Sequence, residues 1–331
     1  MFMVAGIFFL REMLVYTFTR LLVRVRSSTV LALLFVAVGA LLSAFLDALT
    51  VLAVMITVAG GFYAVYHRVA SGKARHAPEH DASADGDVGD SHRADLEQFR
   101  RFLRGLMMHG AIGTTIGGVC TLVGEPQNLL IGKEAGWDFI RFAVEMAPVT
   151  VPTAIAGLAT CVLVEKLVWF GYGVPMPAAV RQVLTEFERE ESEQMTPRHL
   201  QVILVQGVVA VLLVLALALH VAEIGVIGLM IIVLATAFTG VVDEQRLGKA
   251  FEAALPFTAL LVVFFAIVGI IHQQHLFGPF FSWVLTLDSG YQPIALFGAS
   301  GLLSAISDNV FVATIYITQA KEALLAGALS R

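Results

Sequence analysis

Long apolar runs separated by short charged blocks dominate the sequence. Residues 29–66 and 201–242 are apolar almost throughout, and each run is long enough for two helices that cross a bilayer, since about 20 residues span the hydrocarbon core. Another apolar run covers residues 139–165. Helices of soluble domains are usually shorter and keep one polar face. The pattern therefore predicts an all-α polytopic membrane protein.

The charged blocks between these runs predict polar loops. Residues 67–101 are rich in Asp, His, Ser and Arg, which predicts a solvated loop, and residues 166–200 contain EFEREESE, typical of a polar helical loop. Basic residues flank 29–66 on both sides, and such residues favour the cytoplasm. This run is therefore either two full spans or a re-entrant hairpin, whose tip is tolerated only when it is buried in protein or lines a cavity.

Composition supports a membrane protein. Of 331 residues, 58% are hydrophobic and 14% are charged, whereas a soluble domain carries about 25% charged residues. The net charge is −5, and no basic stripe with interleaved aromatics points to nucleic acid. Cys120 and Cys161 lie in apolar segments without metal-ligand spacing, so we interpret them as small buried hydrophobes.

One acid interrupts the run at 29–66. Asp47 lies in SAFLDALTV (43–51), and a carboxylate at membrane depth costs about 3 kcal/mol. The pattern returns as SAISDNVFV (304–312), in which Ser, Ala, Asp and Val recur at the same offsets, so that Asp308 matches Asp47. FMVAGI, which begins at Phe2, also matches FAIVGI, which begins at Phe265. Two copies of an acid-bearing apolar segment predict a transporter with its site between two repeats.

A second unusual stretch is GGVCTLVGEPQNLLI, at the end of the apolar run 102–131. Pro126 lacks an N–H and clashes with the preceding turn, so a helix should break here, and Gly124 permits a tight turn. A kinked helix with small residues for close packing is the plainer interpretation. Glu125 beside the break, with Thr121 and Asn128 close in sequence, favours the other interpretation, because oxygen side chains and freed carbonyls suit a hard cation.

Counting the crossings gives an inverted arrangement. If residues 29–66 form a hairpin that opens inside, the second hairpin opens outside, as an inverted repeat requires, although two full spans give the same parity. The predicted units are a first repeat at 1–165 (hairpin 29–66, polar loop 67–101, broken helix 102–131, span 139–165), a cytoplasmic polar loop at 166–200, two connecting spans at 201–242, and a truncated second repeat at 255–331 with hairpin 293–318.

Four stretches closely resemble the NhaB family of bacterial sodium/proton antiporters: LLSAFLDALTV, VGEPQNLLI, KLVWFGYG and LLSAISDNVFVATIYI. The resemblance covers essentially all 331 positions. It implies membership of the wider ion transporter superfamily, in whose sodium-coupled dicarboxylate carriers hairpin tips face helix breaks and together bind sodium and substrate. The second break motif of that pattern would follow residue 331, so we expect a fragment that lacks both ends.

The resemblance places residues 46–48 and 307–309 at the two hairpin tips and residues 124–126 at the first helix break. Where the dicarboxylate carriers have neutral residues, this chain has acids, which repel a carboxylate but bind a cation or a proton. The expected function is exchange of Na⁺ or Li⁺ for H⁺ by alternating access across the bacterial inner membrane. The predicted ion-binding residues are Asp47, Asp308, Glu125, Ser307, Asn309, Thr121 and Asn128, and no cofactor is expected.

Alternative functions stay open. Within the superfamily these are a sodium-coupled carboxylate symporter and an anion efflux carrier, and this chain alone could be an inactive fragment. An enzyme is not expected, because we find no HExxH, paired-Asp peptidase signature or Ser/His dyad. The expected partners are the lipid bilayer, Na⁺ or Li⁺, and H⁺, with a homodimer left open. A membrane acid can also simply pair with a base such as Arg11 or His109, and we expect His109 to be a packing residue rather than a proton relay.

Overall fold

A computed structural model of the chain describes residues 2–46, 48–74, 81–241, 243–274, 278–288, 290–305, 309, 312–313, 316–317 and 321. These residues form helices and contain no strand, which confirms the all-α prediction. The helices are α1 (Phe2–Phe8), α2 (Arg11–Arg24), α3 (Ser28–Ser43), α4 (Ala48–Ala70), η1 (Asp85–Asp87), α5 (Asp90–Gly118), α6 (Pro126–Ala135), α7 (Phe139–Leu167), η2 (Trp169–Gly171), α8 (Ala178–Glu193), α9 (Pro197–Ala218), α10 (Ile224–Thr239), α11 (Glu244–Gln273), α12 (Gly278–Leu285) and α13 (Gln292–Ser304).

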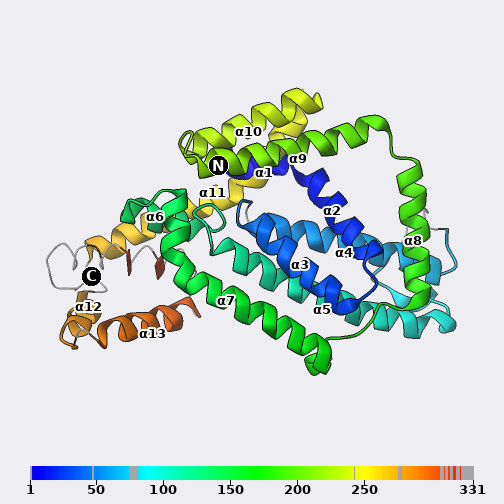
Figure 1. The fold of residues 1–331 in the computed structure, drawn as a ribbon, viewed down its shortest axis with the longest axis horizontal. Coiled ribbons are helices and arrows are strands. Elements are labelled where there is room, and N and C mark those ends of the chain that lie inside the picture. Colours follow the sequence, from blue (N-terminus) through cyan, green and yellow to red (C-terminus); the bar gives the residue numbers. More distant parts are fainter. Residues whose placement is uncertain are drawn as a thin grey trace.

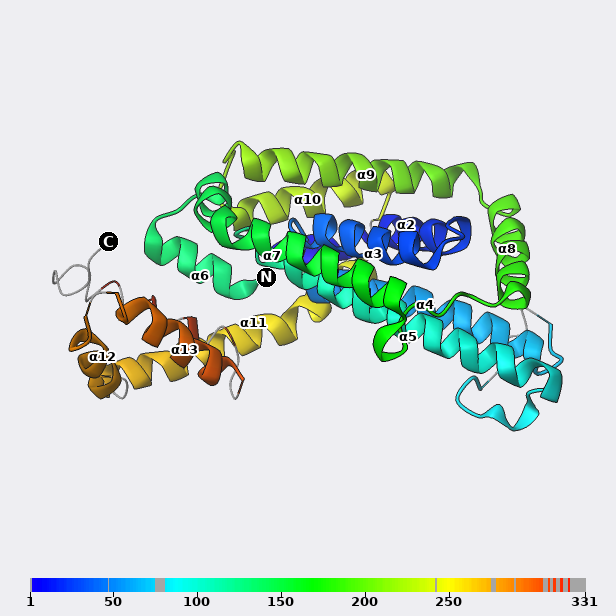
Figure 2. The same ribbon diagram turned by 60° about the horizontal axis from the view of Figure 1, so that its bottom comes forward.

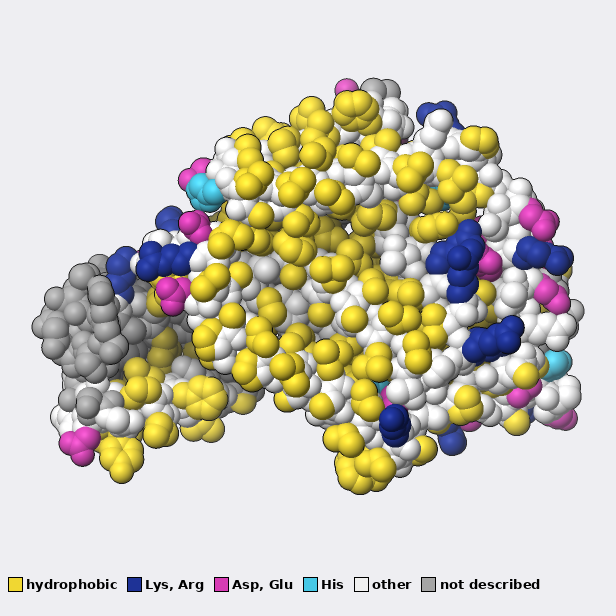
Figure 3. Space-filling view, viewed as in Figure 1, with side chains coloured by type: hydrophobic (Ala, Val, Ile, Leu, Met, Phe, Trp, Pro, Cys, Tyr) yellow, Lys and Arg dark blue, Asp and Glu magenta, His cyan; other side chains and the backbone are white. Residues whose placement is uncertain are grey.

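Three described helices, α4, α7 and α9, are long and apolar enough to cross a membrane, and the shorter α3 and α10 are also apolar. Many of their large apolar side chains are exposed, among them Val144 and Ile155 on α7 and Leu204 and Val208 on α9. Figure 3 shows this apolar surface across the middle of the molecule, while lysines and arginines gather mostly toward its two ends. An apolar surface of this extent is typical of a protein embedded in lipid.

The most intimate helix contact joins α3 to α5, which run side by side in both ribbon views (Figures 1 and 2). Glycines of α5 make this approach possible. A Cβ added to Gly117 would lie 1.9 Å from the carbonyl oxygen of Ala40, and a Cβ added to Gly113 would lie 2.5 Å from that of Val36. Small residues that let two helix backbones touch are characteristic of membrane proteins.

The helix α5 begins earlier than the sequence predicts. Residues 67–101 were expected to be a loop, but α5 starts at Asp90, and the prediction is wrong for its last twelve residues. The reason is an apolar stripe that packs on α4: Leu96 and Phe99 are buried, and the ring centroid of Phe99 lies 5.9 Å from that of Tyr66. A stripe with helical period overrides the polar composition of the segment.

Hydrogen bonds of charged side chains hold the N-terminal part of α5 and the short helix η1 against α4. Arg100 on α5 donates two hydrogen bonds to the Asp85 carboxylate, at 2.8 and 2.5 Å, and two to the hydroxyl of Tyr63 on α4. The imidazole of His67, also on α4, lies 3.3 Å from Asp85 Oδ1. The hydrogen bonds from Arg100 are the main cause that lowers the pKa of Asp85 to about 2.

The second copy of the acid motif begins at the end of α13, which lies with α12 at the lower left of Figure 1, and α11 connects these helices to the rest of the molecule by packing on α1. The two copies share one local feature. The helix α3 ends at Ser43 and α13 ends at Ser304, which are the matched serines, and each following alanine has αR backbone geometry. Both acid motifs therefore begin at a helix end. The helix α11 starts at Glu244, eleven residues before position 255, where the second repeat was expected to begin.

Candidate ion-binding site

Two helix interruptions lie against each other in the first half of the chain. One separates α3 from α4, between Ser43 and Ala48, and the other separates α5 from α6, between Gly118 and Pro126. Pro126 occupies the first turn of α6, where its missing N–H costs nothing, and it prevents a continuous helix through residues 122–126. Each interruption frees carbonyls at the end of one helix and N–H groups at the start of the next.

Direct contacts join the two interruptions. The buried hydroxyl of Thr121 donates a hydrogen bond to the carbonyl oxygen of Ala44. Ser43 donates from its hydroxyl to the carbonyl oxygen of Thr114 on α5, at 2.7 Å. A Cβ added to Gly124 would lie 2.8 Å from the carbonyl oxygen of Ser43, so only glycine fits there. The two breaks are therefore locked together through backbone atoms.

Asn128 holds the second interruption together. It is 5% exposed, and its side-chain amide donates to the carbonyl oxygens of Gly118 at 3.0 Å and Thr121 at 2.8 Å. These carbonyls are left without helical partners where α5 ends. The amide nitrogen of Asn128 therefore stabilises the break, and its amide oxygen is the atom that can serve as an ion ligand.

Glu125 lies between the C-terminus of α5 and the N-terminus of α6. It is the residue before α6, with φ −140° and ψ 144°, and it is half-buried. Its carboxylate lies against the end of α5, since a Cβ added to Gly118 would be 2.8 Å from Glu125 Oε1. The N-terminus of α6 favours the negative carboxylate, and the C-terminus of α5 favours a cation beside it. Together they suit a bound cation or proton next to Glu125.

Several predicted site residues lie outside the described residues: Asp47, Ser307 and Asp308. Both neighbours of Asp47 are buried, Leu46 at 2% and Ala48 at 7% exposure. Asn309 is described and exposed. The structure thus brings Thr121, Gly124, Glu125, Pro126 and Asn128 together with residues 43–46. In the described part of the second copy, α13 packs on α12, and Lys321 Nζ lies 2.9 Å from Glu134 Oε2 of α6.

Sequence reasoning missed the part played by Ser43. Its hydroxyl is fully buried and fixes the end of α3 to α5. The signal was present, because Ser43 recurs as Ser304 in the second motif. A repeated serine at the last residue before a helix interruption could have been interpreted as a second anchor rather than as part of the apolar background.

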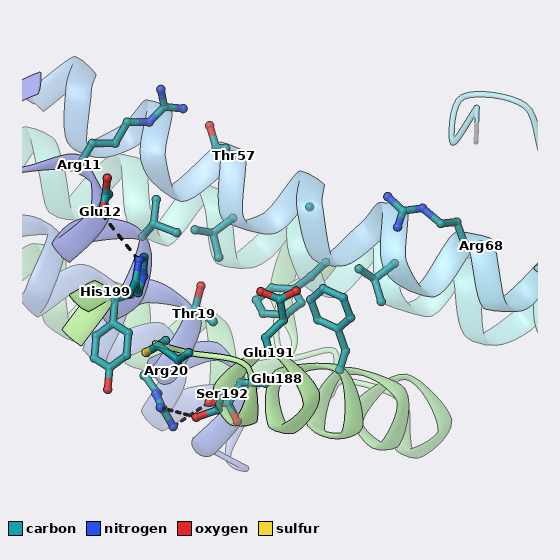
Figure 4. Close-up of a pocket in the computed structure, with 18 residues that line it drawn as sticks. Arg11, Glu12, Thr19, Arg20, Thr57, Arg68, Glu188, Glu191, Ser192 and His199 are labelled. Atoms are coloured by element: carbon teal, nitrogen blue, oxygen red, sulfur yellow. Dashed lines mark hydrogen bonds and ion pairs between the residues drawn. The ribbon is translucent and has the colours of Figure 1, made fainter. Parts of the chain in front are cut away.

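The larger cavities of the described structure lie elsewhere. One of about 530 Å³ opens between α2, α4, α8 and α9 and is lined by both charged and apolar residues (Figure 4). Within it Arg20 Nη1 lies 2.6 Å from Glu188 Oε1, and His199 Nδ1 lies 4.0 Å from Glu12 Oε2. None of the predicted ion-binding residues lines this cavity.

Comparison with known proteins gives a uniform result. The family model for the bacterial Na⁺/H⁺ antiporter B (NhaB) matches residues 1–331. Curated relatives named Na⁺/H⁺ antiporter NhaB are 58% identical in Hahella chejuensis, 60% in Pseudomonas putida and 58% in Marinobacter nauticus. Each match covers the whole of this chain and 66% of the relative, so the chain spans about two thirds of the length of these proteins. No solved structure matches.

Proposed function

This chain belongs to the bacterial Na⁺/H⁺ antiporter B (NhaB) family, and from that premise we propose that it contributes the ion-binding site of an antiporter that exchanges Na⁺ or Li⁺ for H⁺ across the bacterial inner membrane. The observation that carries the proposal is the contact between the two helix interruptions, with Glu125 at their junction. Interrupted helices that meet inside a membrane protein provide carbonyls and helix ends for an ion.

The proposed seat contains two acids. Glu125 lies against the end of α5, and Asp47 follows Leu46 directly after the residues that contact Thr121 and Gly124. A carboxylate shielded from water holds a proton or a Na⁺, but not both at once. Competition of the two ions for the same oxygens couples their movement in opposite directions.

Oxygen atoms from neutral groups complete the proposed Na⁺ shell. The candidates are the side-chain oxygens of Thr121 and Asn128 and the carbonyls at the ends of α3 and α5, which fit a hard cation. In the inverted arrangement that the repeated motif predicts, Ser307, Asp308 and Asn309 provide the matching tip from the second half. Alternating exposure of this seat then exchanges outside protons for inside sodium.

The test is Na⁺-dependent proton movement by the complete protein in proteoliposomes. We expect exchange to be abolished in Asp47→Asn and strongly reduced in Glu125→Gln. Glu145→Gln is the matched control, because Glu145 is an exposed acid of α7 that pairs with Arg141 at 3.7 Å. Normal exchange in both site variants would refute the proposed seat. Sodium-driven uptake of a dicarboxylate without proton exchange would instead favour the carboxylate symporter.

A further inference from the structure

Another acid, Glu165, lies in the protein interior, away from the helix interruptions. Glu165 near the end of α7 and His109 on α5 form a buried pair, in which His109 Nε2 lies 2.9 Å from Glu165 Oε1. The side chain of Glu165 is 7% exposed and that of His109 is 1% exposed. His109 precedes Gly118, the last residue of α5, by nine positions, so the pair is about 14 Å along the helix from the break.

One carboxylate oxygen of the pair makes no hydrogen bond to the described residues. It is the second oxygen of Glu165, Oε2, which is buried. The other ring nitrogen of His109, Nδ1, lies 3.2 Å from the sulfur of Cys161. Among the described residues the carboxylate is therefore bonded through one of its two oxygens, and a buried polar atom without a partner is costly.

The chain after α7 folds back over this pair. Tyr172 places its ring 4.9 Å from the imidazole of His109. Gly173 makes the return possible: its φ is +76°, and a Cβ there would lie 2.4 Å from the carbonyl oxygen of Glu165. Trp169 and Phe170, just before it, are exposed. Exposed aromatics beside Lys166 are typical of the membrane–water interface, so this end of α7 lies close to water.

A cavity of about 10 Å³ connects Glu165 with this surface, and it is just large enough for one water molecule. The ionisable groups that face the pair are Cys161 from α7, Tyr172 from the returning segment and Arg101 from α5, which lines the cavity. The helix α3 contributes only Ser28 and Ala32. Arg101 is 61% exposed and opens the cavity to solvent.

The charge of the pair depends on one proton. With neutral His109 and ionised Glu165, the pair carries one buried negative charge. Uptake of one proton by the imidazole gives an imidazolium–carboxylate ion pair with no net charge. A buried ion pair is far less costly than a single buried charge. The site thus gains a proton and loses its net negative charge, and the attraction between the two ions draws α5 and α7 together.

We propose that His109 and Glu165 form a second proton-binding site, distinct from the ion seat, which exchanges protons with the cytoplasmic surface and sets the pH range of transport. The inference rests on the proposed antiport only for its effect on transport, because proton binding itself is independent of it. Since α5 carries the pair and ends at the helix break, a change in the α5–α7 contact is transmitted to Gly118 and Glu125.

The primary experiment measures proton binding directly. Ring-¹⁵N-histidine NMR spectra of the complete protein in lipid bilayers are recorded across about pH 5 to 9, the range in which histidines titrate. We expect one titrating signal that disappears in His109→Gln and changes its midpoint in Glu165→Gln but not in Glu145→Gln. If His109→Gln does not fold, the signal is identified by its response to the isosteric Glu165→Gln alone. A His109 signal that is constant over this range, or unaffected by Glu165→Gln, overturns the proposal.

The second readout is the pH profile of Na⁺-dependent proton movement. We expect Glu165→Gln to shift the profile while exchange at the optimum is retained, and His199→Gln, from the exposed pair with Glu12, to leave it unchanged. A uniform loss of rate without a shift indicates a structural role and overturns the regulatory part. Titration of His109 in a protein that shows no exchange would refute the antiport and leave the proton-binding site standing.

Discussion

Replacing Gly117 by alanine tests whether the contact between α3 and α5 positions the candidate site. The added Cβ would lie 1.9 Å from the carbonyl oxygen of Ala40 and 2.6 Å from its Cα and carbonyl carbon. All three atoms belong to the backbone, so no rotamer change relieves the clash. To restore ordinary contact of 3.4 Å, the two helices must separate locally by about 1.5 Å.

That separation has two costs. Overpacking a well-packed core typically costs about 1–3 kcal/mol, and the upper part of this range applies where backbone must move. Moving α3 away from α5 also strains the hydrogen bonds that Ser43 and Thr121 make between the two interruptions. We therefore expect Gly117→Ala to lower the thermal stability of the protein and to weaken Na⁺ binding, which shows as a higher half-saturating Na⁺ concentration.

The assay is thermal unfolding in detergent combined with Na⁺-dependent proton movement in proteoliposomes. Gly60→Ala on α4 is the matched control, because a Cβ at Gly60 has no atom within 4 Å. Alanine is the better helix former by about 1 kcal/mol, so this control should be as stable as the wild type or more so. If Gly117→Ala unfolds at the temperature of Gly60→Ala and binds Na⁺ normally, the close packing of α3 on α5 is not what positions the site.

Three further predictions follow from single interactions. Thr121→Val removes the hydroxyl that donates to Ala44 and should lower stability by about 1–3 kcal/mol with weaker Na⁺-dependent exchange, checked by the same two assays. Asn128→Ala leaves two buried carbonyls without donors and should lower the unfolding temperature more than Thr121→Val does; equal unfolding temperatures would contradict this. Asp85 has its pKa lowered to about 2, from about 3.9 when unfolded, so its contribution is present above pH 4 and is lost as the pH falls toward 2. Because Asp85 is 41% exposed, that contribution should be below about 1 kcal/mol. Asp85→Asn should therefore reduce stability at neutral pH and flatten its acid dependence, as followed by helical circular dichroism.

The helix break was accessible from sequence because its cause is local. Pro126 and its neighbouring glycines interrupt a helix whatever surrounds them, and the structure places the break there. The helical start of α5 was not accessible, because Asp90 to Arg101 has a polar composition and becomes helical by packing Leu96 and Phe99 on α4.

Partners distant in sequence were also beyond prediction. Glu165 and His109 are 56 residues apart, and nothing in the pattern of either segment indicates that they meet. Asn128 was expected only as a ligand, whereas its amide nitrogen caps the carbonyls of Gly118 and Thr121. Whether a polar side chain stabilises a break or binds an ion depends on which atoms the fold brings within reach, and a linear motif does not specify that.

The backbone contacts between the two interruptions have a mechanical consequence. Thr121 is tied to Ala44, and Gly124 touches Ser43 with no room for a side chain between them. The two helix interruptions cannot separate without breaking these contacts, so they cannot act as two independent gates. In the proposed antiport, the two interruptions would therefore move together as one rigid unit past the surrounding helices, with the moving boundary outside the α3–α5 contact rather than within it.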